Sequence, residues 1–390
     1  MPVRIGISTM ASLPVSACSS DRPRRPRWLG AAGLTALLAL AVCTVSAPAA
    51  VAAEPPAPAP ETVASVLMYH RVGNPDHPTT NVTTAQFRAH LDYLQANDFQ
   101  VVPLARVVEA MELGESLPPR TVAITFDDGY RSVGDTAHKL LTERDWPYTV
   151  FVNTAPVDAG SDGHMDWDRM RELAADGVRF GNHSQSHNPL FFRREGETRP
   201  RWRERIRADL TTAQARLREE LGDAVHQSPP LLAYPYGEYS LELMDQVAEL
   251  GFVAFGQQSG AIGLHANYLA LPRFSFNERY GDLDGFAVKV RSRAMPVTGQ
   301  TPLDPVREDR AAPRLTLTLA PDTDMRISQM ACYYQGERLT PEAQEADGRF
   351  VVKGKAELPV GRSRYNCTAP DADGRYFWFS QLWVVGDGGT

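Results

Sequence analysis

The sequence predicts an α/β fold, either an α/β barrel or a doubly wound sheet, followed by a small all-β domain. Strand-like and helix-like segments alternate from about residue 62 to residue 295, as in chains built from βα units. After Pro296 the pattern changes to a linker and then to runs of alternating apolar and polar residues. In both kinds of α/β fold the chemistry lies at the carboxyl ends of the strands, so those ends are where site residues are expected.

The first 53 residues have the pattern of a secretory signal. A cluster of arginines precedes an apolar run over 28–45, and residues 51–53 offer a cleavage site. An uncleaved membrane anchor is the alternative, but the run is short for a spanning helix and is interrupted by Gly30 and Gly33. We therefore expect an exported protein, periplasmic or extracellular, without stable membrane insertion.

The charge balance limits the possible partners. The chain has 40 basic and 47 acidic residues, a net charge of −7. Removing residues 1–53 takes away five Arg and one Asp, which leaves 35 basic and 46 acidic residues and a net charge of −11. A protein this acidic repels anionic partners, so nucleic acid and anionic membrane surfaces are not expected to bind it.

Two of the four cysteines, Cys18 and Cys43, lie in the predicted signal. The remaining pair, Cys332 and Cys367, is expected to form a disulfide in an exported protein. A metal site is the alternative, but neither residue has a second Cys or His beside it at ligand spacing. Cys43 is itself a candidate for lipid anchoring, although the preceding Val42 is bulkier than the residue usual at such sites.

The elements of the α/β region follow from local signals. One early helix begins with the capping-box pair Thr83 and Gln86 and places Phe87 and later leucines on one face. A highly charged helix is expected over 199–221, ending at Gly222, and its charges need no role beyond a solvated face. The expected strands are 65–69, 100–103, 122–126, 149–153, 178–181, 231–234, 252–255 and 269–274.

The domain boundaries follow from composition. A Pro-rich linker at 54–61 leads into the α/β domain, which is expected over 62–298. A second linker at 299–313 leads into the small β domain at 314–390. Within that domain the alternating pattern predicts strands at 314–319 and 376–385.

Two adjacent carboxylates, Asp127 and Asp128, follow the apolar run 122–126. Successive side chains of a strand point to opposite faces, so the two converge only where the strand gives way to a loop, as Gly129 indicates. Without a cation, two clustered carboxylates repel and one tends to protonate. A metal ion removes this difficulty, because one carboxylate can act as a ligand and the other as a base.

His183 and His187 are further ligand candidates. They are four residues apart, which places both imidazoles on one face if the segment is helical. Two His and one Asp leave metal positions open for water and substrate, as in catalytic sites. Taken alone, the pair is a weak signal and is more typical of an ordinary surface helix than of a metal site.

Three motifs in this order resemble the polysaccharide deacetylase superfamily of carbohydrate esterases. They are Thr125-Phe-Asp-Asp-Gly129, His183-Ser-Gln-Ser-His187 and Tyr234-Pro-Tyr-Gly237. The resemblance covers about residues 62–295 and implies a distorted (β/α) barrel. Without the other two motifs, the third would be read as an ordinary turn.

The resemblance implies a role for each matched residue. Asp128, His183 and His187 would hold a divalent metal, with zinc expected and cobalt or nickel as alternatives. Asp127 would be the general base that deprotonates the attacking water. The backbone N–H of Tyr236 would help to stabilise the oxyanion of the tetrahedral intermediate.

The chain departs from the common form of the family at two places. Many members have an Arg where this chain has Ala233, and a late Leu-x-His where this chain has Leu271-Pro-Arg-Phe274. Arg273 is the candidate to replace that Arg near Asp127. His70, at the end of the first strand, is the candidate general acid. These features resemble the subgroup that deacetylates poly-β-1,6-N-acetylglucosamine.

The expected activity is therefore metal-dependent removal of N-acetyl groups from a polysaccharide that contains N-acetylglucosamine, with poly-β-1,6-N-acetylglucosamine as the expected substrate. Peptidoglycan and chitooligosaccharides are the alternative substrates, and a non-catalytic polysaccharide-binding protein on the same fold is the alternative from another class. The aromatic residues at 376–379 and Trp383 either fill the core of the β domain or form a sugar-stacking platform. Glycan and protein are therefore both candidate partners of that domain.

Overall fold

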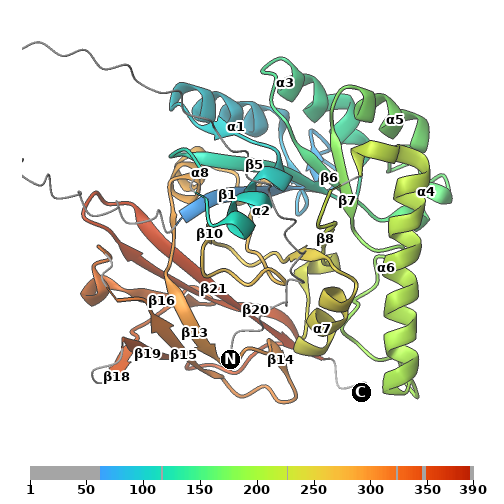
Figure 1. The fold of residues 1–390 in the computed structure, drawn as a ribbon. Helices are drawn as coiled ribbons and strands as arrows, with labels where there is room; N and C mark the ends of the chain where they lie inside the picture. Colours follow the sequence, from blue (N-terminus) through green and yellow to red (C-terminus); the bar gives the residue numbers. More distant parts are fainter. Residues whose placement is uncertain (1–61, 116, 226, 322–323, 345–347, 387–390) are drawn as a thin grey trace, which may run out of the picture. The chain divides into compact units, whose positions relative to one another are not determined.

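A computed structural model describes residues 62–115, 117–225, 227–321, 324–344 and 348–386 (Figure 1). The predicted signal, the linker at 54–61 and Cys43 lie outside these ranges. Within them, no helix has the length and the apolar content needed to cross a membrane.

A curled half-barrel of mostly parallel strands forms the first region. Its order is β10-β1-β5-β6-β7-β8-β9, with β4 beside β5 and β11 beside β1. A bridge joins Phe255, the last residue of β9, to Leu271, so the segment that leads into β11 spans the side between β9 and β1. This is the distorted (β/α) barrel that the sequence predicts. The strands are β1 (Thr62–Tyr69), β4 (Gln100–Val101), β5 (Thr121–Asp127), β6 (Thr149–Val152), β7 (Arg179–Asn182), β8 (Leu231–Ala233), β9 (Val253–Phe255), β10 (Ile262–Gly263) and β11 (Phe274–Ser275).

The helices begin and end where local signals place them. Thr83 caps α1 in a complete capping box with Gln86, and α6 ends before Gly222, both as predicted. Figure 1 shows α1, α3, α5 and α6 around the outside of β1, β5, β6 and β7. The helices are α1 (Thr84–Ala96), α2 (Leu104–Leu113), α3 (His138–Thr142), α4 (Thr154–Asp158), α5 (Trp167–Ala175), α6 (Arg199–Leu221), α7 (Leu241–Glu249) and α8 (Leu283–Val290).

Two strand predictions need correction. The strand predicted at 100–103 ends at Val101, because Pro103 is the N-terminal cap of α2. The strand predicted at 269–274 is wrong over most of its length, since only Phe274 belongs to β11. The Asn267 side chain accepts the N–H of Leu269 in a local turn, and Pro272 has no N–H to offer to a ladder.

The C-terminal region is built from two further sheets. One has the order β12-β21-β20-β16-β17 with β14 beside β21, and the other has the order β13-β15-β19-β18. A disulfide joins Cys332 on β16 to Cys367 on β20, and Trp383 is fully buried in the core of this region. The strands are β12 (Arg293–Ala294), β13 (Val297–Thr301), β14 (Val306–Arg307), β15 (Arg314–Leu319), β16 (Ala331–Tyr334), β17 (Glu337–Leu339), β18 (Glu342–Gln344), β19 (Arg349–Lys353), β20 (Gly361–Pro370) and β21 (Tyr376–Val385).

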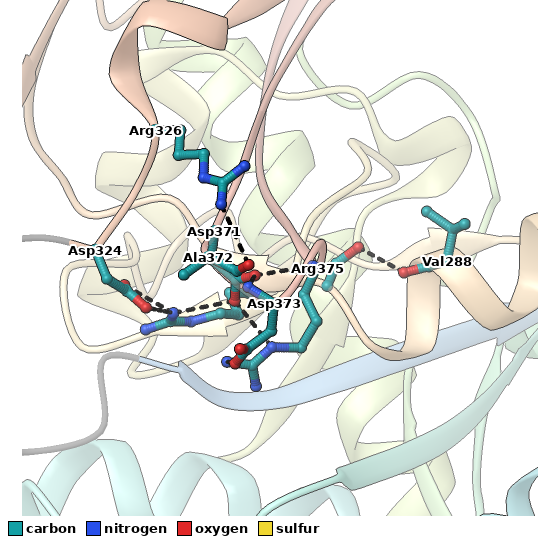
Figure 2. Close-up of polar contacts among 9 residues, drawn as sticks. Val288, Asp324, Arg326, Asp371, Ala372, Asp373 and Arg375 are labelled. Carbon is teal, nitrogen blue, oxygen red and sulfur yellow. Dashed lines mark hydrogen bonds and ion pairs between the residues drawn. The ribbon is translucent and has the colours of Figure 1, made fainter.

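A buried carboxylate organises the turn between β20 and β21 (Figure 2). Asp371 accepts hydrogen bonds from the backbone N–H groups of Asp373 and Arg375, each 2.9 Å long. The Arg375 side chain donates to the same carboxylate, and Arg293 of β12 lies 3.3 Å from it. Arg293 also contacts Asp324 at 2.6 Å. The carboxylate therefore ties the hairpin to β12, the strand that leads out of the barrel region.

Candidate active site

The two adjacent aspartates lie where β5 ends. Asp127 is the last residue of the strand, and Asp128 has a φ of 73°, in the left-handed region that only a few non-glycine residues adopt. Gly129 continues the turn with a φ of 70°. Both aspartates are buried, with exposed fractions of 0% and 4%. The turn at Asp128 sends the two carboxylates into different surroundings, which a regular strand would not allow.

Asp128, His183 and His187 come together as a group of ligand atoms. One atom from each residue lies within 4.8 Å of the other two. Asp128 Oδ1 is 3.0 Å from His187 Nε2 and 3.3 Å from His183 Nε2. The His183 side chain is 1% exposed and the His187 side chain 22% exposed, so the group is open to solvent on the His187 side.

The segment that carries the two histidines is not helical, so the condition under which helical spacing would bring them together is not met. β7 ends at Asn182, and His183 to His187 form a loop in which Ser184 and His187 have φ values of 67° and 56°. Ser184 Oγ accepts the N–H of His187 at 2.9 Å, and Asn182 Oδ1 accepts the N–H of Ser184 at 2.8 Å. These side-chain bonds stabilise a turn in place of a helix.

The charged helix α6 holds this loop from outside. Asp209 Oδ1 accepts the N–H of Gln185 at 2.7 Å and lies 3.4 Å from the N–H of Ser186. Asn182 Nδ2 donates to Leu210 O at 2.9 Å. A helix that the sequence analysis treated as a solvated surface element therefore positions the loop that carries both histidines.

The donor set fits a divalent metal. His183 Nδ1 lies 2.7 Å from Ala233 O, so this nitrogen carries the proton, and Nε2 of a neutral ring has a free lone pair. That lone pair faces Asp128 Oδ1, and neither atom has a hydrogen-bond partner among the described residues. Two buried acceptors that face each other need a cation between them, and a metal bound by Asp128, His183 and His187 would supply it.

Asp127 is paired with Arg273. Arg273 Nη1 and Nη2 donate to the two carboxylate oxygens at 2.7 and 2.8 Å, and both side chains are fully buried. Arg273 Nε donates to Gly256 O at 3.0 Å, which fixes the guanidinium plane. Burial raises the pKa of Asp127, but the charge and hydrogen bonds of Arg273 and the charges of His183 and His70 together outweigh burial and hold this pKa below the usual value.

His70 lies at the same edge of the barrel. β1 pairs with β5 so that Tyr69 is level with Phe126, which puts His70 level with Asp127 on the neighbouring strand. Burial lowers the pKa of His70, and the charges of Asp128 and Asp127 oppose that effect. The imidazole therefore lies within the electrostatic field of the aspartates, as a residue of the same site.

Tyr236 lies in a tight turn beside the histidines. Its φ is 59° and its ring centroid is 4.7 Å from that of His187. Gly237 N–H donates to Tyr234 O at 2.8 Å and closes the turn. A left-handed non-glycine residue next to the ligand cluster is the kind of strained conformation that often marks a functional site.

Three residues near the cluster were not identified from the sequence. The Arg71 guanidinium carbon is 3.3 Å from the ring centroid of Tyr130, and the ring of His164 is 5.0 Å from that of Tyr130. The charge of Asp128 acts on the pKa values of both Tyr130 and His164, although burial is the larger effect on each. Tyr130 directly follows the Asp-Asp-Gly motif, which was an available signal, whereas nothing in the sequence distinguishes His164.

Comparisons with known proteins agree with this geometry. Residues 114–255 match the polysaccharide deacetylase family model. The poly-β-1,6-N-acetyl-D-glucosamine N-deacetylase of Escherichia coli (strain K12) is 26% identical over 226 residues, which cover 50% of this chain and 33% of that protein. The polysaccharide deacetylase YxkH, named as putative, of Bacillus subtilis (strain 168) is 24% identical over 187 residues. These residues cover 48% of this chain and 61% of YxkH. The chain thus spans less than two thirds of either relative.

A solved structure supports the fold assignment. The Streptococcus pyogenes deacetylase PplD, determined in complex with acetate, superposes with a TM-score of 0.51 at 20% identity. The superposition covers 59% of this chain and 99% of PplD. The half-barrel therefore has the polysaccharide deacetylase fold, and residues 114–255 within it match the polysaccharide deacetylase family.

Proposed function

We propose that the protein is a metal-dependent hydrolase that removes N-acetyl groups from a polysaccharide containing N-acetylglucosamine. The observation that carries the proposal is the pairing of two aspartates with different partners at one strand end. Asp128 lies against two histidines, and Asp127 lies against Arg273. One carboxylate is thus placed to bind a metal while the other stays ionised and available as a base.

Zinc is the metal that suits these donors best. Two atoms bound at about 2.0–2.1 Å to a tetrahedral zinc lie about 3.4 Å apart. Asp128 Oδ1 is 3.0 and 3.3 Å from the two imidazole nitrogens, close to that spacing. A zinc ion bound here would polarise the acetyl carbonyl and lower the pKa of a water to about 7.

The chain's own residues would move the protons. Asp127 would accept the proton of the attacking water, because Arg273 occupies only two of the about four lone-pair positions of its carboxylate. The low pKa of Asp127 makes it a weak base, so it depends on a water that is already acidic. The Tyr236 N–H would donate to the oxyanion, and His70 would protonate the leaving nitrogen.

The polymer that we propose as the substrate is more specific than the family match, which indicates only a polysaccharide. The Escherichia coli relative is named for poly-β-1,6-N-acetyl-D-glucosamine, and we propose the same polymer here. The arrangement of His70 and Arg273 supports the choice, since it fills the two roles left open by Ala233 and by the missing late histidine. Peptidoglycan and chitooligosaccharides remain the alternative substrates. We propose that the protein acts after export, as the predicted signal indicates.

The C-terminal region offers a second contact for a glycan. Tyr333 and Tyr376 are 39% and 40% exposed, and with the half-buried Trp378 they line a groove of about 360 Å³ together with Val288, Asn366 and Thr368. Aromatic faces next to amide and hydroxyl groups suit the apolar faces and hydroxyls of sugars. We propose that this groove binds the same polysaccharide. Trp383, considered for the same role from the sequence, is fully buried and fills the core instead.

One experiment separates the alternatives. Amine release is measured from poly-β-1,6-N-acetylglucosamine, chitooligosaccharides and peptidoglycan side by side, before and after chelation and again after zinc is added back. We expect release from the β-1,6-linked polymer, loss on chelation and recovery with zinc. A preference for chitooligosaccharides would overturn the substrate. Binding without release from any of the three polymers would support the non-catalytic alternative.

A further inference from the structure

An arginine of the C-terminal sheet reaches the candidate active site. Arg362 is the second residue of β20, and its Nη1 donates to the backbone carbonyl of Tyr236. The same nitrogen lies 3.3 Å from Gln257 Oε1, and Arg362 Nε lies 3.4 Å from Glu238 Oε1. The guanidinium carbon is 5.8 Å from the centroid of the Tyr236 ring. A single side chain therefore contacts three residues in and beside the turn Tyr234–Gly237.

This turn is one that needs outside support. A left-handed φ at Tyr236 is unfavourable for a non-glycine residue, so it persists only when its surroundings hold it. Gly237 is left-handed as well, at 71°, and a Cβ there would lie 2.5 Å from the side chain of Gln257. Arg362 thus bonds to the turn and to Gln257, the residue against which the turn packs.

The turn also contacts the ligand cluster. The Tyr236 ring packs against His187, whose Nε2 is 3.0 Å from Asp128 Oδ1. Arg362 and His187 therefore contact the same residue, Arg362 through the backbone carbonyl of Tyr236 and His187 through its ring. The ion pair with Glu238 is partly shielded, since the Arg362 and Glu238 side chains are 36% and 12% exposed. Because water screens a shielded ion pair less, the attraction between Arg362 and Glu238 is stronger than between two fully exposed charges and helps to hold Arg362 in place.

We propose that Arg362 is a positioning residue of the active site. It fixes the Tyr234–Gly237 turn so that the backbone N–H of Tyr236 points at the oxyanion formed during hydrolysis. The inference rests on the proposed function and extends it, because it makes the C-terminal sheet part of the catalytic unit. Preorganised donors stabilise a transition state only when their direction is fixed in advance, and a displacement of about 1 Å can cost a hundredfold in rate.

The test compares Arg362→Gln and Arg362→Lys with Arg314→Gln, an exposed arginine on β15. We expect Arg362→Gln to keep its bound metal and its KM but to lose roughly tenfold to a hundredfold in kcat. The loss should be equal on amide and activated ester substrates, since both pass through an oxyanion. Arg362→Lys should recover part of the rate because it keeps one cationic donor. Arg314→Gln should have the same bound metal, KM and kcat as the protein without substitutions.

A second measurement needs no turnover. A phosphonate analogue of the N-acetyl group mimics the tetrahedral oxyanion, and its affinity, measured by calorimetry, should fall in Arg362→Gln by the same factor as kcat, while the affinity for the free amino sugar stays constant. Unchanged affinity for the phosphonate would overturn the inference. So would a change confined to KM, which would make Arg362 a substrate contact. If the protein without substitutions binds the phosphonate but hydrolyses no polymer, the proposed function is overturned instead. The calorimetry would still decide the role of Arg362.

Discussion

Neighbouring residues with the same side chain take different roles because their partners differ. Asp127 meets a buried guanidinium with both carboxylate oxygens, and Asp128 Oδ1 lies 3.0 and 3.3 Å from the Nε2 atoms of His187 and His183. The first environment keeps the carboxylate ionised. The second would suit Asp128 to bind a metal together with the two imidazoles, since Asp128 Oδ1 has no hydrogen bond among the described residues.

Substitution of each aspartate by asparagine should separate the two roles. Asp128→Asn should lose bound metal, while Asp127→Asn should retain it and lose most turnover, because an amide cannot accept a proton from water. Asp127→Asn also leaves the buried charge of Arg273 unpaired, so its free energy of unfolding should fall by on the order of 3 kcal/mol. Metal content, kcat and thermal unfolding are measured on both variants. Loss of metal from Asp127→Asn would mean that the two roles are reversed.

Besides the two ligand candidates, His70 and His164 lie in the field of Asp128, and only one of these two can be the principal acid. His70 is level with Asp127 on the adjoining strand, whereas His164 lies beside Tyr130. We expect His70→Ala to keep its metal and to lose roughly two to four orders of magnitude in rate on an amide substrate. An activated acetate ester, whose leaving group needs no proton, should be affected much less.

His164→Ala is the matched control for that experiment. It removes an imidazole that is also coupled to Asp128, so a general electrostatic effect would appear in both variants. The ratio of amide to ester rates should change in His70→Ala alone. The opposite pattern would assign the proton to His164.

At the residue scale, the sequence allowed the motif residues to be proposed but not their supporting contacts. The aspartates and histidines have motif spacing, and Arg273 was proposed because an arginine was missing elsewhere. Arg362 and His164 carry no such signal. They are far from the motifs in sequence and come close only through folding, which one sequence without relatives cannot reveal.

At the scale of elements, two segments that are neither helix nor strand position residues of the candidate site. The histidine loop is not helical, yet its two imidazoles converge because Asn182 and Ser184 bond to the backbone. The strand expected before Arg273 is largely absent, yet the segment spans β9 and β1 and delivers the arginine to Asp127. Periodicity predicted the regular elements well. It could not predict loops that are defined by side-chain hydrogen bonds.

Helix α6 gives a test at this scale. Asp209→Ala removes the acceptor that holds the backbone of Gln185 and Ser186, so His183 and His187 lose part of their preorganisation. We expect metal affinity to fall by roughly 10–100-fold, as is usual when outer contacts of a metal site are lost. Glu204→Ala, at an exposed position on the same helix, should leave the affinity unchanged. A zinc titration with a competing chelator measures both, and equal affinities would exclude a positioning role for α6.

At the scale of the whole molecule, the C-terminal sheets are more than an appended domain. Leu382 and Val384 of β21 pack in one cluster with Leu232 of β8 and with Tyr234, the first residue of the third motif. Arg362 extends the same contact to the turn itself. The alternating pattern predicted an all-β tail with strands at 314–319 and 376–385. The surface on which β21 packs could not be inferred, because the apolar alternation of a strand does not identify its partner.

The groove that is proposed to bind glycan, lined by Tyr333, Tyr376 and Trp378, lies on the same face of the sheet as Arg362. Cross-strand pairs place Thr368 opposite Trp378 and Asn366 opposite Tyr333, and Asn366 is four residues along β20 from Arg362, or about 13 Å at the usual rise. A polymer long enough to reach both places would bind more tightly than a short one.

The contribution of the groove to substrate binding should therefore depend on the length of the substrate. Replacing both Tyr333 and Tyr376 by Ala should raise KM for the long polymer by roughly tenfold, if each stacked ring contributes about 0.5–1 kcal/mol. The KM for a substrate of one or two sugars should not change, since so short a molecule does not span the about 13 Å of β20 between Arg362, beside the candidate active site, and Asn366 in the groove. Tyr280→Ala, which removes a tyrosine that is 54% exposed outside the groove, controls for loss of any exposed ring. An equal effect on short and long substrates would show that the tyrosines act through folding, and no effect on either would leave the groove without a role in binding the polysaccharide.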